Sequence, residues 1–177
     1  MFEAIPSPHF GLNYDPSHLV RLRIDYLRVL EEFGERINHC HGKDTEILQN
    51  ELYEYGTLPA SFGAKLKFTE GSWRYTIPGR GLVNWGMVAE QLDRFGYQGV
   101  VSIELEDHNY WGTLEAEQQG IVEAAKFLAK HFKCVFKKWL CKAQGVRSRS
   151  TKRRRSVRVW YMSKSLWDSA KQSAVEF

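Results

Sequence analysis

Ionisable side chains close three segments of this sequence that are predicted to be strands. Asp15 ends FGLNYD, His41 ends RINHCH, and Glu104 and Glu106 end GVVSIELE. Side chains alternate between the faces of a strand, so these two glutamates lie opposite the apolar residues of their segment. One imidazole and two carboxylates that meet would suit Mn, Co, Zn or Mg better than copper. Such an ion would relieve the repulsion between the carboxylates and could polarise a hydroxyl or carbonyl group.

Each of these residues also has an ordinary structural explanation. Asp15-Pro16 is a turn signal, and a lone aspartate after a strand usually forms a turn or caps a helix. A histidine in a strand is usually a polar residue with satisfied hydrogen bonds, and the spacing His39-x-His41 is a weak signal. Glu104 and Glu106 could form the solvated face of an edge strand. Periodicity alone therefore leaves the metal site open.

Alternating strands and helices predict how these side chains are positioned. We expect strands over residues 10–15, 36–41 and 99–106. We expect one helix capped by Asp25 and ending at Gly34, a second capped by Asn84 and ending at Gly96, and a third over about 114–132. This α/β alternation predicts a parallel sheet with crossover helices, in which a site forms at the carboxyl ends of the strands.

A weak internal repeat, EEFGERINHCH and DRFGYQGVVSIE, has its excess length in a loop over about 43–83. The glycines of 77–81 could indicate phosphate binding, but they fit neither a Walker loop nor GxGxxG, and a loop leading to the Asn84 cap is the simpler interpretation. Trp73, Arg74 and Tyr75 could wall a pocket or anchor a buried loop.

The amino-acid composition limits the classes of protein to which this chain can belong. The chain has 177 residues with 43% hydrophobic and 26% charged residues, which fits one globular domain. No apolar run reaches the roughly 18 residues of a membrane helix, and no signal peptide is recognisable. Three cysteines without a CxxC pair favour a reducing cytoplasm. Residues 133–177 hold 13 Lys and Arg against two acids, whereas residues 1–132 hold 12 against 19.

Four blocks taken in order resemble a known family: GLNYDPSHL, INHCHGKDTEI, WRYTIPGRGLVNW and GYQGVVSIELED. They resemble the sugar phosphate isomerase/epimerase family, which has the xylose isomerase-like TIM-barrel fold. The resemblance implies a partial (β/α)8 barrel over 1–132, made of about the last three βα units, strands six to eight. Residues 133–177 would then form a basic, poorly ordered tail, either a native extension or unrelated sequence.

The resemblance also implies the roles of individual residues. It places one divalent metal ion (Mn, Mg, Co or Zn) on Asp15, His41 and Glu104, with Glu104 as a catalytic acid or base that moves a proton next to a carbonyl. It places His18 and Lys43 against a sugar or sugar phosphate.

Strands one to five of such a barrel, and a further glutamate ligand, are not in the sequence. We therefore expect that the chain alone is inactive and that a partner chain supplies the first half of the barrel. Two other functions stay open: nucleic-acid binding through the basic tail, related to endonuclease IV-like proteins, and a non-catalytic remnant. The expected location is cytoplasmic.

Overall fold

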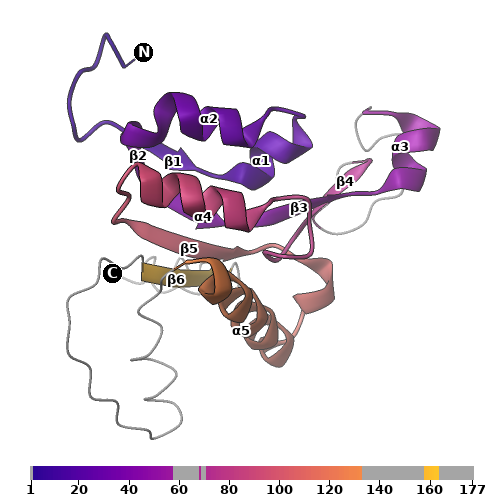
Figure 1. Cartoon of the computed structure of the whole chain (residues 1–177). Helices are drawn as coiled ribbons and strands as arrows, with labels where there is room; N and C mark the ends of the chain where they lie inside the picture. The colour runs from indigo at the N-terminus through magenta and orange to yellow at the C-terminus, as the bar shows by residue number, and fades with distance from the viewer. Residues whose placement is uncertain (1, 58–67, 69–70, 133–157, 164–177) are drawn as a thin grey trace, which may run out of the picture.

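A parallel four-stranded sheet organises the molecule (Figure 1). The computed structural model describes residues 2–57, 68, 71–132 and 158–163. The sheet has the order β1-β2-β5-β6, and each neighbouring pair is parallel. Its strands are β1 (Leu12–Tyr14), β2 (Ile37–Gly42), β5 (Val100–Leu105) and β6 (Arg158–Ser163). A separate antiparallel pair consists of β3 (Asp44–Ile47) and β4 (Trp73–Thr76).

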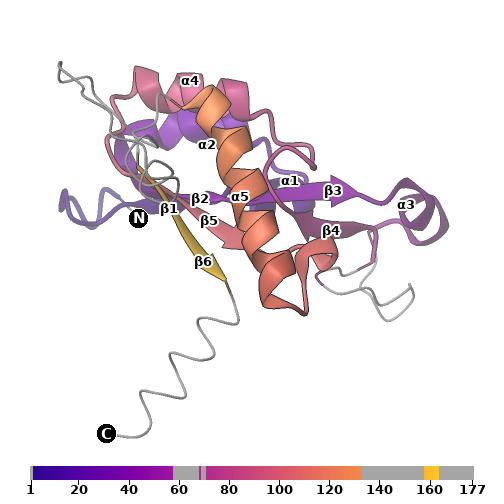
Figure 2. The ribbon, with the colours of Figure 1, turned by 90° about the horizontal axis from the view of Figure 1, so that it is seen from below.

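The helices α2 (Tyr26–Phe33), α4 (Trp85–Arg94) and α5 (Leu114–His131) cover one face of the four-stranded sheet. The short helix α1 (Pro16–Arg21) contacts β3 and β4, and α3 (Gln49–Tyr55) follows the far end of β3 in Figure 1. Two short 3-10 turns are η1 (Gly34–Arg36) and η2 (His108–Tyr110). Figures 1 and 2 show α2, α4 and α5 on the same side of the strands. Side-chain caps start these three helices: Asp25 accepts from the backbone of α2, Asn84 from that of α4 and Thr113 from that of α5.

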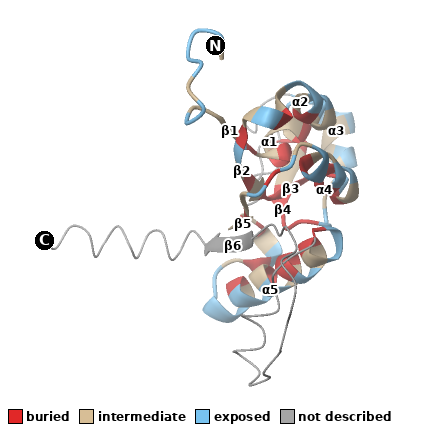
Figure 3. Cartoon of the chain, turned by 60° about the vertical axis from the view of Figure 1, so that its left-hand side comes forward, coloured by how far each residue is buried: buried red, intermediate tan, exposed pale blue. Residues whose placement is uncertain are grey.

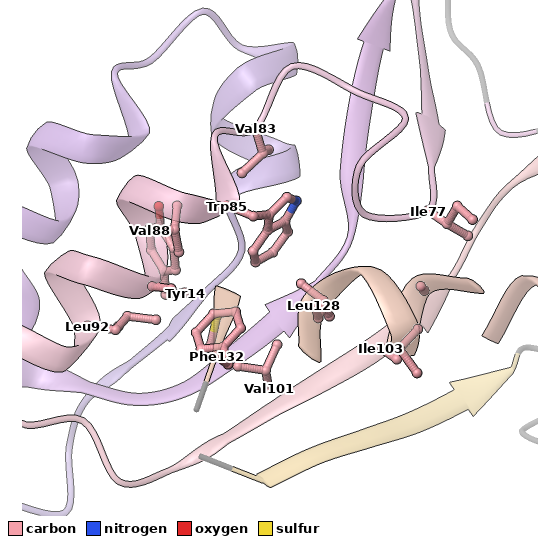
Figure 4. Packing of buried hydrophobic residues seen from close by; sticks show 14 of the residues in the cluster. Tyr14, Ile77, Val83, Trp85, Val88, Leu92, Val101, Ile103, Leu128 and Phe132 are labelled. Carbon is pink, nitrogen blue, oxygen red and sulfur yellow. The ribbon is translucent and has the colours of Figure 1, made fainter. Parts of the chain in front are cut away.

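The hydrophobic core fills the space between this face of the sheet and the helices (Figures 3 and 4). Val101, Ile103 and Leu105 alternate along β5 and are all buried, as the sequence pattern predicts. Leu128 of α5 and Trp85 of α4 are also fully buried. This packing fixes the strands from behind, so that the ends of β1, β2 and β5 have defined positions.

The other face of the sheet is polar. Along β2, His39 and His41 are half-buried and their rings meet edge to face with centroids 5.4 Å apart. Ser102 and Glu104 of β5 are half-buried, and Asn13 of β1 is exposed. No helix of the described residues lies over this face (Figure 2). Separately, no helix in the described part of the chain is long and apolar enough to cross a bilayer.

The predicted strands and the three predicted helices are confirmed to within a few residues. The parallel sheet with crossover helices is also confirmed for the four-stranded sheet. The prediction of a continuous loop over about 43–83 is wrong, because it contains β3, α3 and β4. Trp73, Arg74 and Tyr75 belong to β4 rather than to a loop.

Two further elements were not predicted. The six-residue helix α1 follows Asp15 directly, where the sequence indicated only a turn. The strand β6 lies within the basic segment 133–177 and pairs with β5 along its whole length. The rest of that predicted tail, 133–157 and 164–177, lies outside the described residues.

Candidate functional site

Three predicted ligands meet at the carboxyl ends of neighbouring strands. Asp15 follows β1, His41 is the penultimate residue of β2, and Glu104 is the penultimate residue of β5. One ligand atom from each lies within 4.8 Å of the other two. Because β1, β2 and β5 are adjacent and parallel, residues far apart in sequence reach one edge of the sheet.

The distances within this triad suit a shared cation. His41 Nδ1 lies 3.3 Å from Asp15 Oδ2 and 3.1 Å from Glu104 Oε2. Neighbouring ligands of an octahedral ion with bonds of about 2.1 Å are about 3 Å apart. The other ring nitrogen, Nε2, contacts the side-chain amide of Asn13 at 3.2 Å, which fixes the ring orientation. The donor set of one imidazole and two carboxylates therefore fits a divalent ion.

Asp15 has two tasks, one for each carboxylate oxygen. Its Oδ1 accepts hydrogen bonds from the backbone N–H of Ser17 at 2.9 Å and from the Ser17 hydroxyl at 2.5 Å, which caps α1. Pro16 begins that helix with no N–H to satisfy. The second oxygen, Oδ2, faces His41. The helix cap and the ligand are thus compatible interpretations of one residue.

Lys43 places a buried positive charge beside the triad. It is 1% exposed, and its Nζ lies 2.7 Å from Glu104 Oε2 and 3.5 Å from Asp15 Oδ2. Glu106 Oε2 is farther away, at 3.8 Å, and the Tyr75 ring centroid lies 4.5 Å from Nζ. A buried ammonium group is tolerated only when it is paired, and here two carboxylates of the triad pair with it.

These contacts shift the pKa values of all three triad residues. Hydrogen bonds to Asp15 and then to Glu104 raise the pKa of His41 to about 9, against the opposing effect of burial. Burial would raise the pKa of Asp15, but hydrogen bonding to His41 and the charge of Lys43 lower it to about 2. The hydrogen bond with His41 is also the main cause that lowers the pKa of Glu104 to about 2, helped by Lys43. In the metal-free chain at neutral pH, His41 is therefore cationic and both carboxylates are ionised.

His18 lies beside the triad and is oriented by Tyr75. The Tyr75 hydroxyl contacts His18 Nδ1 at 2.6 Å, while His18 Nε2 lies 3.4 Å from Asp15 Oδ2 and 3.5 Å from Lys43 Nζ. Burial lowers the pKa of His18 and raises that of Tyr75. A neutral imidazole that accepts at Nδ1 from the phenol and donates from Nε2 to Asp15 satisfies both contacts. Both predicted substrate residues, His18 and Lys43, thus adjoin the triad.

Sequence reasoning missed the structural role of Asp44. This buried carboxylate accepts hydrogen bonds from the backbone N–H groups of Gly79 at 3.1 Å and Val83 at 3.0 Å, and from Trp85 Nε1 at 3.0 Å. A side chain at Gly81 would collide with the same carboxylate. The glycine-rich segment therefore folds around Asp44 on its way to α4, as the simpler interpretation of that segment expected. In the sequence, the closely spaced glycines of 77–81 were the signal that this segment packs tightly against another group.

A family model described as "Xylose isomerase-like TIM barrel" matches residues 1–131. The chain is 35% identical over 121 residues to the inosose dehydratase of Geobacillus thermodenitrificans, which covers 67% of this chain and 34% of that protein. It is 34% identical over 102 residues to the uncharacterized protein YfiH of Bacillus subtilis, which covers 56% of this chain and 32% of that protein. It is also 30% identical over 96 residues to the inosose dehydratase of Lacticaseibacillus casei, over 54% of this chain and 30% of that protein.

The chain spans about a third of the length of these curated relatives. Its parallel α/β sheet, with helices on one face and polar side chains at the carboxyl ends of the strands, is the arrangement of part of a (β/α)8 barrel. The match to the family model covers every element from β1 to α5. The chain belongs to the xylose isomerase-like TIM barrel family.

Proposed function

We propose that this chain forms part of a divalent-metal-dependent enzyme that moves a proton on a sugar or sugar phosphate, as an isomerase or epimerase does. The observation that carries the proposal is the convergence of Asp15, His41 and Glu104 within 4.8 Å. A bound divalent ion would supply a Lewis acid that polarises a carbonyl or hydroxyl oxygen of the sugar. The metal is Mn, Mg, Co or Zn, since all four accept imidazole and carboxylate ligands.

The side chains around the triad would do the remaining work. Glu104 is ionised at neutral pH and its side chain is 33% exposed, so it is in the form of a base and accessible to a substrate. Its low pKa makes it a weak base, and a metal ion that polarises the carbonyl would offset this by making the neighbouring C–H more acidic. Lys43 would hold the Glu104 carboxylate in place and donate hydrogen bonds to a substrate oxygen. His18, fixed by Tyr75, would orient a substrate hydroxyl.

A second candidate activity comes from the relatives named inosose dehydratase. Removal of water next to a carbonyl begins with the same step as epimerisation, which is removal of a proton from the neighbouring carbon. The two activities differ in what leaves afterwards. The same triad and the same base would serve both, so the substrate decides between them.

We also propose how the chain relates to a whole barrel. β1, β2 and β5 would correspond to barrel strands six to eight, residues 1–132 would form one unit, and residues 133–177 a separate basic tail. A partner chain that supplies the first half of the barrel would complete the site with the missing glutamate ligand. We place the protein in the cytoplasm, because Cys40 is a buried free thiol and the sequence has three cysteines with no CxxC pair.

The first experiment measures binding of Mn²⁺ to the full chain by electron paramagnetic resonance and calorimetry. His41→Ala should abolish the binding, whereas His39→Ala, two residues earlier on the same face of β2, should leave it unchanged. If both variants bind Mn²⁺ with the same affinity as the parent protein, the triad is not a metal site. In a complex that turns over, Glu104→Gln should stop exchange of substrate C–H protons in D₂O, and exchange at the parental rate would contradict the role of Glu104.

A further inference from the structure

A polar cavity lies apart from the triad, between the end of α1 and the β3–β4 pair. It has a volume of about 460 Å³, and among the described residues its lining combines two guanidinium groups with apolar and hydroxyl side chains and no acid: Arg21, Leu22, Arg23, Ile47, Thr57, Ser72 and Trp73. Ligand pockets for small molecules typically have volumes of about 300–1,000 Å³. The cavity is therefore large enough for a small organic ligand, and its charge favours an anion.

Arg21 is held in the cavity with no acidic partner in the part of the chain that the structure describes. Its guanidinium carbon lies 4.9 Å from the centroid of the Trp73 ring and 5.9 Å from that of Tyr75. Its Nε is buried and has no hydrogen-bond partner within the described part of the chain. Arg28 and Arg80, by contrast, each pair with a glutamate. Stacking on aromatic rings thus positions Arg21, whose charge no carboxylate of the described residues pairs with.

Arg23 adds a second cation to the lining of the cavity. It is exposed and its φ is +60°, in the left-handed region that non-glycine residues rarely adopt. Its backbone N–H donates to the carbonyl of Val20 at 3.0 Å, and the next N–H, of Ile24, donates to the carbonyl of Leu19 at 2.9 Å. The tight turn that follows α1 thus fixes the backbone at Arg23, which lines the cavity together with Arg21.

We propose that this cavity binds the phosphate group of a small organic phosphate. Two guanidinium groups offer the paired N–H donors that match phosphate oxygens, and the walls formed by Leu22, Ile47 and Trp73 suit the carbon part of the ligand. Tyr75 links the two places, because its ring centroid lies 5.9 Å from the guanidinium carbon of Arg21 and 4.5 Å from Lys43 Nζ. The proposal rests on the proposed function in that it gives the phosphate of a sugar phosphate a binding place. None of the lining residues belongs to the triad, so binding in the absence of metal and binding of Mn²⁺ can fail separately.

The test is calorimetric titration of the full chain in EDTA, which removes any contribution of a metal. Ribose 5-phosphate should bind, ribose should not, and inorganic phosphate should compete. Arg21→Gln and Arg23→Gln should each weaken the binding at least about tenfold, since each removes charge-assisted hydrogen bonds. Equal binding of ribose and ribose 5-phosphate, or tighter binding of gluconate, would overturn the phosphate assignment.

Two control variants distinguish the cavity from non-specific attraction. Arg28→Gln removes an exposed arginine of α2, and Arg153→Gln removes one from the basic segment 133–177; both should keep the parental affinity within about twofold. A loss with Arg153→Gln that equals the loss with Arg21→Gln would overturn the proposal. Circular dichroism checks the folding of each variant. If Arg21→Gln unfolds, the test rests on Arg23→Gln, because Arg23 is exposed and its replacement should not disturb folding. If Arg23→Gln then binds ribose 5-phosphate with the parental affinity, the cavity is not the phosphate site.

Discussion

Replacing Asp15 by asparagine separates the two tasks of this residue. Asparagine caps helices about as well as aspartate, so the cap of α1 should survive. The negative charge that faces His41 and Lys43 at 3.3 and 3.5 Å is lost. Because the pKa of Asp15 falls from 3.8 to about 2, its ionised form should contribute ~2–3 kcal/mol to the free energy of unfolding at pH 7. Asp15→Asn should lose that amount.

The sign of the pH dependence follows from the direction of the shift. A carboxylate whose pKa is lowered by folding stabilises the protein above its ordinary pKa, and this contribution disappears as the pH falls through the lowered value. The difference in stability between Asp15→Asn and the parent should therefore be complete above about pH 5 and shrink toward pH 2. Urea titrations followed by circular dichroism at several pH values measure it.

Metal affinity gives the second part of the same prediction. Loss of a residue that only supports a metal ligand typically costs 10–100-fold, so loss of a direct ligand should weaken Mn²⁺ binding by at least about 100-fold. His41 must release its proton when a metal binds. The affinity of the parent protein for Mn²⁺ should therefore rise about tenfold for each pH unit between pH 7 and about pH 9. Asp15→Asn removes the main partner that raises the pKa of His41, so this dependence should become flatter.

Asp25→Asn is the matched control, because Asp25 caps α2 in the same way, with backbone N–H groups at 3.0 and 3.1 Å, but lies away from the triad. It should change neither Mn²⁺ binding nor stability by more than about 1 kcal/mol. The reasoning is refuted if Asp15→Asn is as stable as the parent at pH 7 and binds Mn²⁺ within threefold of it. Equal losses in Asp15→Asn and Asp25→Asn would assign Asp15 to capping alone.

Other predictions test the surroundings of the triad. Lys43→Met should tighten Mn²⁺ binding about tenfold in calorimetry, because the ammonium 2.7 Å from Glu104 no longer opposes the cation; weaker binding would contradict this. Asp107 is buried, which would raise its pKa, but hydrogen bonds from Thr76 and nearby backbone lower it. Asp107→Asn should therefore cost ~1–3 kcal/mol of unfolding free energy at pH 7 and less in acid, and a loss that does not vary with pH would count against this explanation. Removal of 133–177 should keep the helical circular dichroism, since α1 to α5 all precede it, but should promote self-association through the edge of β5, visible by light scattering. A collapse of the helical signal would show that the segment belongs to the core.

Local signals explain why much of the fold was predictable. The alternation in β5, the caps Asp25 and Asn84 and the apolar faces of α4 and α5 all act within a few residues. Strand ends could be assigned from the same patterns, and the carboxyl ends of parallel strands share one edge of a sheet. This is why the grouping of Asp15, His41 and Glu104 could be expected before their positions were known.

Contacts between segments far apart in the chain could not be predicted from the sequence. The pair β3–β4 joins residues about 30 apart and was predicted as loop, because its strands are short and its intervening residues give no period. The strand β6 gains its partner only by returning to β5 across a long connection. No local pattern encodes such pairings, since their free energy comes from hydrogen bonds and packing that exist only after the chain has folded.

The sequence by itself determined which residue types stand at the ends of β1, β2 and β5, since alternation and capping are local. Only the tertiary structure decided which group each atom of these side chains contacts. It assigned one oxygen of Asp15 to the cap of α1 and the other to His41, and it placed the buried ammonium of Lys43 between two carboxylates. It also stacked Arg21 on Trp73, with its Nε buried and unpaired among the described residues. These arrangements depend on distances between segments far apart in the chain, which packing of the helices against the sheet sets.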